Sequence, residues 1–175
     1  MSLEFLVDYI SVDDIQNPIV RAGIAYWQGL CRGRAYPARP DVSPSGMRKF
    51  LANTALVRVI DDGADYEYRI AGEAHVMSHG IPLQGKKMSE LDGLDPAYRP
   101  VLKSLYDTVA KSHAPQGVRG AIKAADGAPV HYKSESAFLP LGPDEKTVDH
   151  ILVFTVYEGG NQASAGRDNS SFAAR

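Results

Sequence analysis

The chain has 175 residues, of which 44% are apolar and 23% are charged, and its formal net charge at pH 7 is −2. Both fractions are close to the average for globular domains, so the composition excludes disorder throughout, and the length suffices for one core. The small net charge argues against nucleic acid as a partner, and no apolar run is long enough to cross a membrane. The lone Cys31 cannot form an internal disulfide and no secretory signal opens the chain, so we expect a cytoplasmic setting.

The first predicted helix follows a leader of residues 4–18. Asn17 can cap free backbone N–H groups, and Pro18 fits the first helical position, so the pair indicates a helix start. Helical spacing of apolar residues continues to about Arg32, and Gly33 ends the helix. The apolar stripe consists of Ile19, Val20, Gly23, Ile24, Trp27, Leu30 and Cys31.

A proline-containing linker, Tyr36–Pro44, leads into a second, short helix predicted to begin at Ser43 and end near Leu51. Residues 54–61 are rich in β-branched side chains and predict a strand. Asp62-Gly63 is typical of a hairpin turn, and a second strand follows over Asp65–Ala71.

Short helical segments are predicted over residues 73–92, where glycines and a proline interrupt them. Asp95-Pro96 opens a longer helix that ends near Ser112. Its apolar residues recur at helical spacing and form one stripe, Tyr98, Leu102, Leu105 and Val109.

The last third of the chain predicts three strands. Residues 116–124 pair with 129–141 around Asp126-Gly127, a second hairpin signal. Residues 149–158 form a nearly continuous apolar run, which is typical of a central strand. Periodicity ends beyond this strand, and residues 159–175 are predicted to be a disordered tail.

This order predicts an α+β fold with a five-stranded antiparallel sheet, helices on one face of it and an additional N-terminal helix. We expect an N-terminal helix and linker over residues 1–45, the main domain over 46–158, and the tail over 159–175.

The middle of the chain resembles the first half of a PAS domain. The resemblance rests on the strand Asp65–Ala71 ending at Gly72, the short apolar helix of residues 73–80, and the sequence Gly85-Lys86-Lys87-Met88-Ser89-Glu90-Leu91. The order of elements fits that family over roughly residues 50–158. The resemblance implies short helices that close one side of a sheet over a small apolar pocket, and a sensory rather than catalytic role.

The N-terminal region is similar to that of stand-alone bacterial PAS proteins. This similarity rests on Tyr26-Trp27, Gly33-Arg34 and the Pro37-x-Arg39-x-Asp41 spacing. No kinase, cyclase or DNA-binding domain accompanies the domain in this sequence. The resemblance therefore implies output through a partner protein or through a homodimer.

The pocket implied by the resemblance would lie in the cleft between sheet and helices. Aromatic residues with hydroxyl groups suit such a pocket, because a buried tyrosine hydroxyl needs a partner. On the strand of residues 129–141, Tyr132, Ser134, Ser136 and Phe138 share one face, which we expect to look into the cavity. The predicted pocket residues are Tyr68, Ile70, Met77, Met88, Tyr106, Tyr132, Ser136 and Phe138.

The stripe of the first helix must be covered by something, because exposed apolar surface of this size is unusual on a monomer. The chain's own sheet or a second subunit are the two covers we expect. The predicted interface residues are Val20, Ile24, Trp27 and Leu30.

Three other groups of residues are candidates for binding or chemistry. His75 and His79 lie four residues apart and would project to one side of a helix, which suits a metal or haem, but polar groups on the surface or at a pocket rim fit the short segment better. Cys31 lies on the apolar stripe and reads as a small hydrophobic residue. Arg32, Arg34 and Arg39 form a weak anion site or a solvated basic surface.

Three functions remain open from the sequence. The first is a sensory module that binds a small molecule of unknown identity, with no cofactor specified. The second is an interaction module whose pocket is filled by its own side chains. The third is a small cavity enzyme of the isomerase type, with His131, Glu135 or His150 as candidate acids or bases.

Overall fold

The computed structural model describes residues 3–124 and 132–159. The predicted turn at Asp126-Gly127, the candidate His131 and nearly all of the predicted tail lie outside these residues, and so does the side chain of Tyr132.

A single antiparallel sheet organises the described chain, with strand order β1-β4-β5-β6-β2-β3. The sheet has six strands in this part of the chain, not the five expected. The predicted strands are present, and β6 lies between β5 and β2, as expected for a central strand. The strands are β1 (Leu3–Ile10), β2 (Thr54–Ile60), β3 (Asp65–Ala71), β4 (Gln116–Ala124), β5 (Tyr132–Leu141) and β6 (His150–Glu158).

The additional strand, β1, comes from the segment predicted to be a leader. It pairs with β4 along its whole length, from Leu3 opposite Ala124 to Ile10 opposite Gly117. Leu3, Phe5 and Val7 are half-buried, while the residues between them are exposed. This alternation of burial is typical of a strand. The exposed face also carries the apolar residue Leu6, so the sequence does not alternate cleanly between apolar and polar residues and did not reveal the strand.

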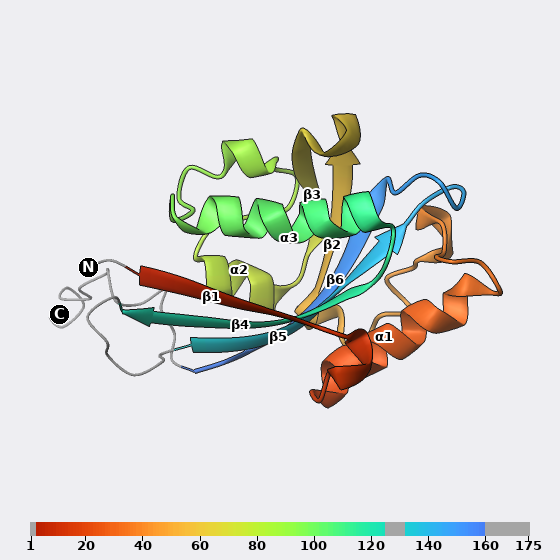
Figure 1. The fold of residues 1–175 in the computed structure, drawn as a ribbon, viewed down its shortest axis with the longest axis horizontal. Coiled ribbons are helices and arrows are strands. Elements are labelled where there is room, and N and C mark those ends of the chain that lie inside the picture. The colour runs from red at the N-terminus through yellow and green to blue at the C-terminus, as the bar shows by residue number, and fades with distance from the viewer. Residues whose placement is uncertain (1–2, 125–131, 160–175) are drawn as a thin grey trace, which may run out of the picture.

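Helices cover both faces of the sheet, which corrects the expectation of one covered face. Figure 1 shows α2 (Glu73–His79) and α3 (Tyr98–Ser112) on one side of the strands and α1 (Pro18–Cys31) on the other. The Tyr106 ring of α3 lies 5.6 Å from the Phe138 ring of β5. On the opposite face, Gly23 of α1 packs directly on the Phe154 ring of β6.

The predicted start of α1 is confirmed. The Asn17 side chain accepts hydrogen bonds from the N–H groups of Ile19 and Val20, and Pro18 is the first helical residue. The Glu135 carboxylate of β5 also accepts hydrogen bonds from the backbone N–H groups of Gln16 and Asn17, at 2.8 and 2.6 Å. These bonds fix the beginning of α1 to the sheet.

The chain's own sheet covers the apolar stripe of α1. Val20, Ile24 and Trp27 are buried, Leu30 is half-buried, and the Trp27 indole donates a 2.9 Å hydrogen bond to the carbonyl of Pro140. The sequence left open whether the chain's own sheet or a second subunit covers this stripe, and within a single chain the sheet covers it.

The shorter helical segments are less regular than expected. Residues 44–50 form turns rather than a helix, and the only helical residues of that region are the 3₁₀ turn Leu51–Asn53. The other 3₁₀ turns in the described part of the chain are Val12–Asp14, Arg39–Asp41, Asp61–Gly63 and Met88–Glu90.

Two glycines of α1 test its packing on the sheet. A Cβ at position 23 would overlap the Phe154 ring, whereas a Cβ at position 29 meets nothing within 4 Å. We expect Gly23→Ala to lower the free energy of unfolding by about 1–3 kcal/mol because of overpacking. We expect Gly29→Ala, the matched control, to raise it by up to about 1 kcal/mol because alanine favours helix. Urea unfolding measures both, and an unchanged or stabilised Gly23→Ala variant would contradict the packing of α1 on Phe154.

Candidate ligand-binding site

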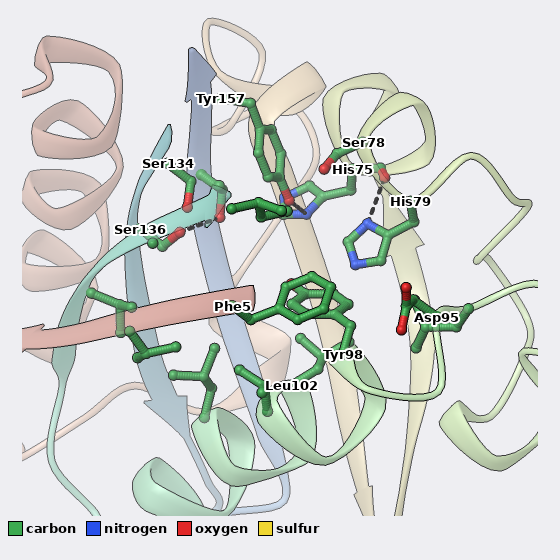
Figure 2. A pocket seen from close by; sticks show the side chains of 18 of the residues that line it. Phe5, His75, Ser78, His79, Asp95, Tyr98, Leu102, Ser134, Ser136 and Tyr157 are labelled. Carbon is green, nitrogen blue, oxygen red and sulfur yellow. Dashed lines mark hydrogen bonds between the residues drawn. The ribbon is translucent and has the colours of Figure 1, made fainter. Parts of the chain in front are cut away.

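A cavity of about 260 Å³ lies between the sheet and the helices α2 and α3. Figure 2 shows side chains from β1, α2, α3, β5 and β6 converging on it. Most of its lining is apolar, and several polar groups stand among the apolar side chains. The polar lining residues are His75, Ser78, His79, Asp95, Tyr98, Tyr106, Ser134, Ser136, Thr155 and Tyr157.

The sheet supplies the floor of the cavity through small side chains. Successive residues of a strand point to opposite faces, so Ser134, Ser136 and Phe138 of β5 all look into the cavity, as the sequence predicts. Gly120 and Ala121 of the neighbouring β4 also line it. Small residues at these positions leave space beneath α3 that larger side chains would fill.

Hydroxyl groups on the floor are bonded to one another. Ser136 lies opposite Thr155 in the register of β5 and β6, and the Thr155 hydroxyl donates a 2.9 Å hydrogen bond to the Ser136 oxygen. Because that bond occupies an acceptor site of Ser136, the Ser136 hydroxyl keeps its own proton for another partner.

Strand β1 forms a wall of the cavity that the sequence interpretation missed. Leu3, Phe5 and Val7 line it, and the Phe5 ring stacks on the Tyr98 ring of α3 at 4.9 Å. An offset or stacked aromatic pair of this kind adds stability beyond the area it buries. The pair joins β1 to α3 across one side of the cavity.

His75 is held in one protonation state by its two partners. Its Nε2 lies 3.1 Å from the carbonyl oxygen of Asn53, which can only accept, so Nε2 carries the hydrogen. Its Nδ1 is then the acceptor, and the Tyr157 hydroxyl donates to it at 3.2 Å. Burial lowers the pKa of His75 to about 3, with a smaller contribution from neighbouring His79, so the ring is neutral at pH 7.

His79 has the opposite tautomer. Its Nδ1 lies 2.8 Å from the carbonyl oxygen of His75, one helical turn earlier, so Nδ1 carries the hydrogen and Nε2 has a free lone pair. Among the buried side-chain polar atoms that the structure describes, His79 Nε2 alone has no hydrogen-bond partner. Burial lowers the pKa of His79 as well, which keeps this ring neutral.

Charge is scarce around the cavity. Asp95 is the only charged side chain among its described lining residues, and it is exposed, with Oδ1 accepting the N–H of Ala97 at 2.8 Å. No lysine or arginine is part of this described lining. The cavity is therefore an apolar chamber with neutral hydrogen-bonding groups.

Three of the predicted pocket residues, Tyr106, Ser136 and Phe138, line this cavity. Tyr68 and Ile70 do not, because β3 is the far edge strand of the sheet. The Tyr68 hydroxyl is instead buried and accepts a 3.1 Å hydrogen bond from Tyr106.

The two predicted methionines also lie outside the lining. Met77 is 49% exposed, because it lies on the side of α2 opposite to His75 and His79. Met88 is buried in the core beside β3. The backbone of Tyr132 belongs to β5, and its side chain lies outside the described residues.

His75 and His79 are the cavity residues whose importance the sequence interpretation underestimated. That interpretation placed both rings on the polar surface or at a pocket rim, whereas the structure buries His75 and the Nε2 atom of His79. Their spacing of four residues was the signal that could have found them. Thr155, which shares the cavity face of β6 with Tyr157, was missed because the apolar run around it shows no alternation of polar and apolar residues.

The remaining candidates have structural roles. Glu135 faces away from the cavity, caps the start of α1 and pairs with Arg119 at 3.2 Å. His150 hydrogen-bonds Asp149. Cys31 is half-buried, burial raises the pKa of its thiol, and its sulfur lies 3.4 Å from the carbonyl of Trp27.

The arginine cluster is divided among separate partners. Arg34 pairs with Asp41 at 2.6 Å, and Arg39 donates to the carbonyl of Val42. Over residues 3–124 and 132–159, histidine, cysteine and acidic side chains do not gather in threes as metal ligands. In the same ranges no helix has both the length and the apolar character needed to cross a bilayer.

The family model described as PAS domain matches residues 15–155. The chain belongs to the PAS domain family. A search of curated proteins finds no match. PAS domains are in general sensory or regulatory modules, and the six-stranded antiparallel sheet with its helices is consistent with that fold.

The buried histidines of the PAS domain predict a pH dependence of stability. Because the folded pKa of His75, about 3, lies below its ordinary value of 6.5, the unfolded chain takes up a proton first on acidification. The free energy of unfolding should therefore fall as the pH drops below about 6.5. We expect His75→Gln to make the loss between about pH 7 and pH 5 smaller by about 1–2 kcal/mol.

Met77→Gln is the matched control, because it lies on the same helix and introduces the same side chain at an exposed position. Its unfolding curve should follow the pH dependence of the parent protein. Urea unfolding at several pH values measures the effect. Parallel curves for the parent and His75→Gln would contradict a buried, neutral His75.

Proposed function

We propose that this PAS domain is a sensory or regulatory module that binds a small molecule in the cavity beneath α2 and α3. The observation that carries the proposal is the cavity itself, about 260 Å³ of mostly apolar lining with polar groups that point inward. Pockets of this character, with a few placed polar groups, are typical of small-molecule sites. The sequence resemblance left open whether side chains fill the pocket, and the cavity favours ligand binding.

The arrangement of β5 and β6 supports a route from the cavity to α1. Val153 and Thr155 line the cavity from one face of β6, and Phe154 between them contacts Gly23 of α1 on the other face. The Trp27 indole is bonded to Pro140, two residues after Phe138 of the cavity. A ligand that prefers one arrangement of these strands would shift α1 by its differential affinity.

In this proposal, output passes from α1 to a partner protein or a second copy of the chain. The support is the outer side of α1, where Ile19 is exposed and Leu30 is only half-buried. The buried residues Val20, Ile24 and Trp27 act in this proposal by holding α1 to the sheet rather than by direct contact.

The two alternative functions have less support. An interaction module without a ligand needs a filled pocket, and the cavity weighs against it. An isomerase-type enzyme needs an acid or base in the pocket from the late strands. Glu135 faces the opposite side of the sheet, His150 is bonded to Asp149, and His131 lies outside the described residues.

Filling the cavity tests the proposed binding. Ser134 lines the cavity, and leucine there would occupy part of its volume. We expect neutral one-ring compounds that bind the parent protein, found by ligand-observed NMR, to bind Ser134→Leu at least about tenfold more weakly. Ser104→Leu makes the same change at an exposed position of α3 and should bind as the parent does. Equal binding to all three proteins would place the site elsewhere.

Hydrogen exchange tests the route to α1. We expect a bound compound to change the hydrogen-exchange rates of the cavity strands and also those of the α1 amides near Gly23. The reason is that β6 lines the cavity on one face and contacts Gly23 on the other. Amides of β3, at the far edge of the sheet, serve as the internal control. A change confined to the cavity strands would contradict transmission through β6.

A further inference from the structure

We infer that the ligand of this cavity is a compact, uncharged molecule with a hydroxyl group, of the size and kind of a simple phenol, whose O–H donates to His79 Nε2. This inference rests on the proposed function, because it names the chemical class that the same cavity would take. It depends on the tautomer of His79, the aromatic walls of the cavity and the absence of buried charged side chains from its described lining.

The acceptor is set by the backbone of α2. The His75 carbonyl takes the Nδ1 hydrogen of His79 at 2.8 Å, so the other ring nitrogen presents a lone pair. This atom is buried, lines the cavity with its ring, and has no partner among the described residues. A buried acceptor without a donor is costly, and a ligand that supplies a donor removes that cost.

The other histidine gives no competing donor or acceptor. His75 uses Nε2 on the Asn53 carbonyl and Nδ1 on the Tyr157 hydroxyl, so both of its ring nitrogens are occupied. The pair therefore presents one open position, and that position accepts a hydrogen. A ligand with only acceptor groups at this end would face a lone pair and be disfavoured.

The walls beside this acceptor are aromatic. The Tyr98 ring lies 5.7 Å from the His79 ring and stacks on Phe5 at 4.9 Å, and the Tyr157 ring lies 5.8 Å from His75. Figure 2 shows the rings of Phe5 and Tyr98 beside His79. Rings of this kind pack well on another flat ring, which favours an aromatic compound over a flexible chain.

The volume limits the ligand to about one ring with small substituents. A cavity of about 150 Å³ holds benzene, so the 260 Å³ here corresponds in proportion to roughly ten non-hydrogen atoms. Large planar cofactors exceed this volume.

The ligand's charge follows from the described lining. No lysine or arginine is present there to pair with an anion, and Asp95, the one acidic residue, is exposed to solvent. Burial of an ion without a buried partner is strongly unfavourable. A neutral hydroxyl group satisfies His79 without this cost.

The test compares four para-substituted toluenes and toluene itself by calorimetric titration of the 175-residue chain. The compounds are 4-methylphenol, 4-methylanisole, 4-methylbenzoate, 4-methylbenzylamine and toluene. We expect 4-methylphenol to bind about tenfold or more tightly than 4-methylanisole, in which a methyl group replaces the donor hydrogen, and than either charged compound.

Variants assign the preference to His79. We expect His79→Leu to bind 4-methylphenol and 4-methylanisole equally, and His79→Gln, whose amide oxygen can accept, to keep part of the preference. Met77→Leu, on the exposed side of α2, should keep all of it. If His79→Leu does not fold, the selectivity of the parent protein and of His79→Gln decides the matter.

Different results would contradict the ligand class alone or the binding function of the cavity as well. Equal binding of the phenol, the ether and toluene would overturn the ligand class and leave the cavity as a binding site. Preference for the benzoate or the protonated amine would also overturn it, in favour of an ionic ligand. Failure of every compound to bind the parent protein would overturn the proposed binding function together with the ligand class.

Discussion

The two-sided burial of β5 and β6 is the constraint on which the rest of the structure depends. Leu139 and Leu152 are fully buried, and each strand is covered by α1 on one face and by α2 or α3 on the other. The central part of a strand in this position has no solvent face, so its buried residues face one of the two helical layers. The cavity and α1 are consequently separated by no more than the thickness of one sheet.

The cavity exists because large side chains fill one part of the space between the sheet and α3, and small side chains leave another part empty. Tyr106 and Phe138 fill the space between α3 and the sheet near its middle, where their rings contact. Toward β1 the cavity face of the sheet carries Gly120 and Ser134 instead, which are too small to fill the space beneath α3. At this end the Phe5 ring of β1 stacks on the Tyr98 ring of α3 and closes the cavity. A short side chain at position 5 would leave this end open.

Much of the fold could be predicted from the sequence because local patterns were strong. Asn17-Pro18 gave the start of α1, and the stripe from Tyr98 to Val109 gave α3. The strand β1 was not predictable in the same way, because Leu6 and Tyr9 blur its alternation and its identity depends on pairing with β4. The alternation of residues on β5 correctly placed Ser136 and Phe138 in the cavity. Tyr68 could be placed only with the strand order, which puts β3 at the far edge of the sheet, and Met77 only with the orientation of α2, which exposes it.

The protonation states of His75 and His79 decide whether the cavity presents a hydrogen-bond acceptor to a ligand. A long-range ¹H–¹⁵N correlation spectrum of the ligand-free protein near neutral pH distinguishes the two neutral tautomers from the imidazolium ion. We expect two neutral rings of opposite tautomer, with the hydrogen of His75 on Nε2 and that of His79 on Nδ1. A His79 ring that carries its hydrogen on Nε2, or that is charged, would contradict an acceptor facing the cavity and with it the assigned chemistry of the site.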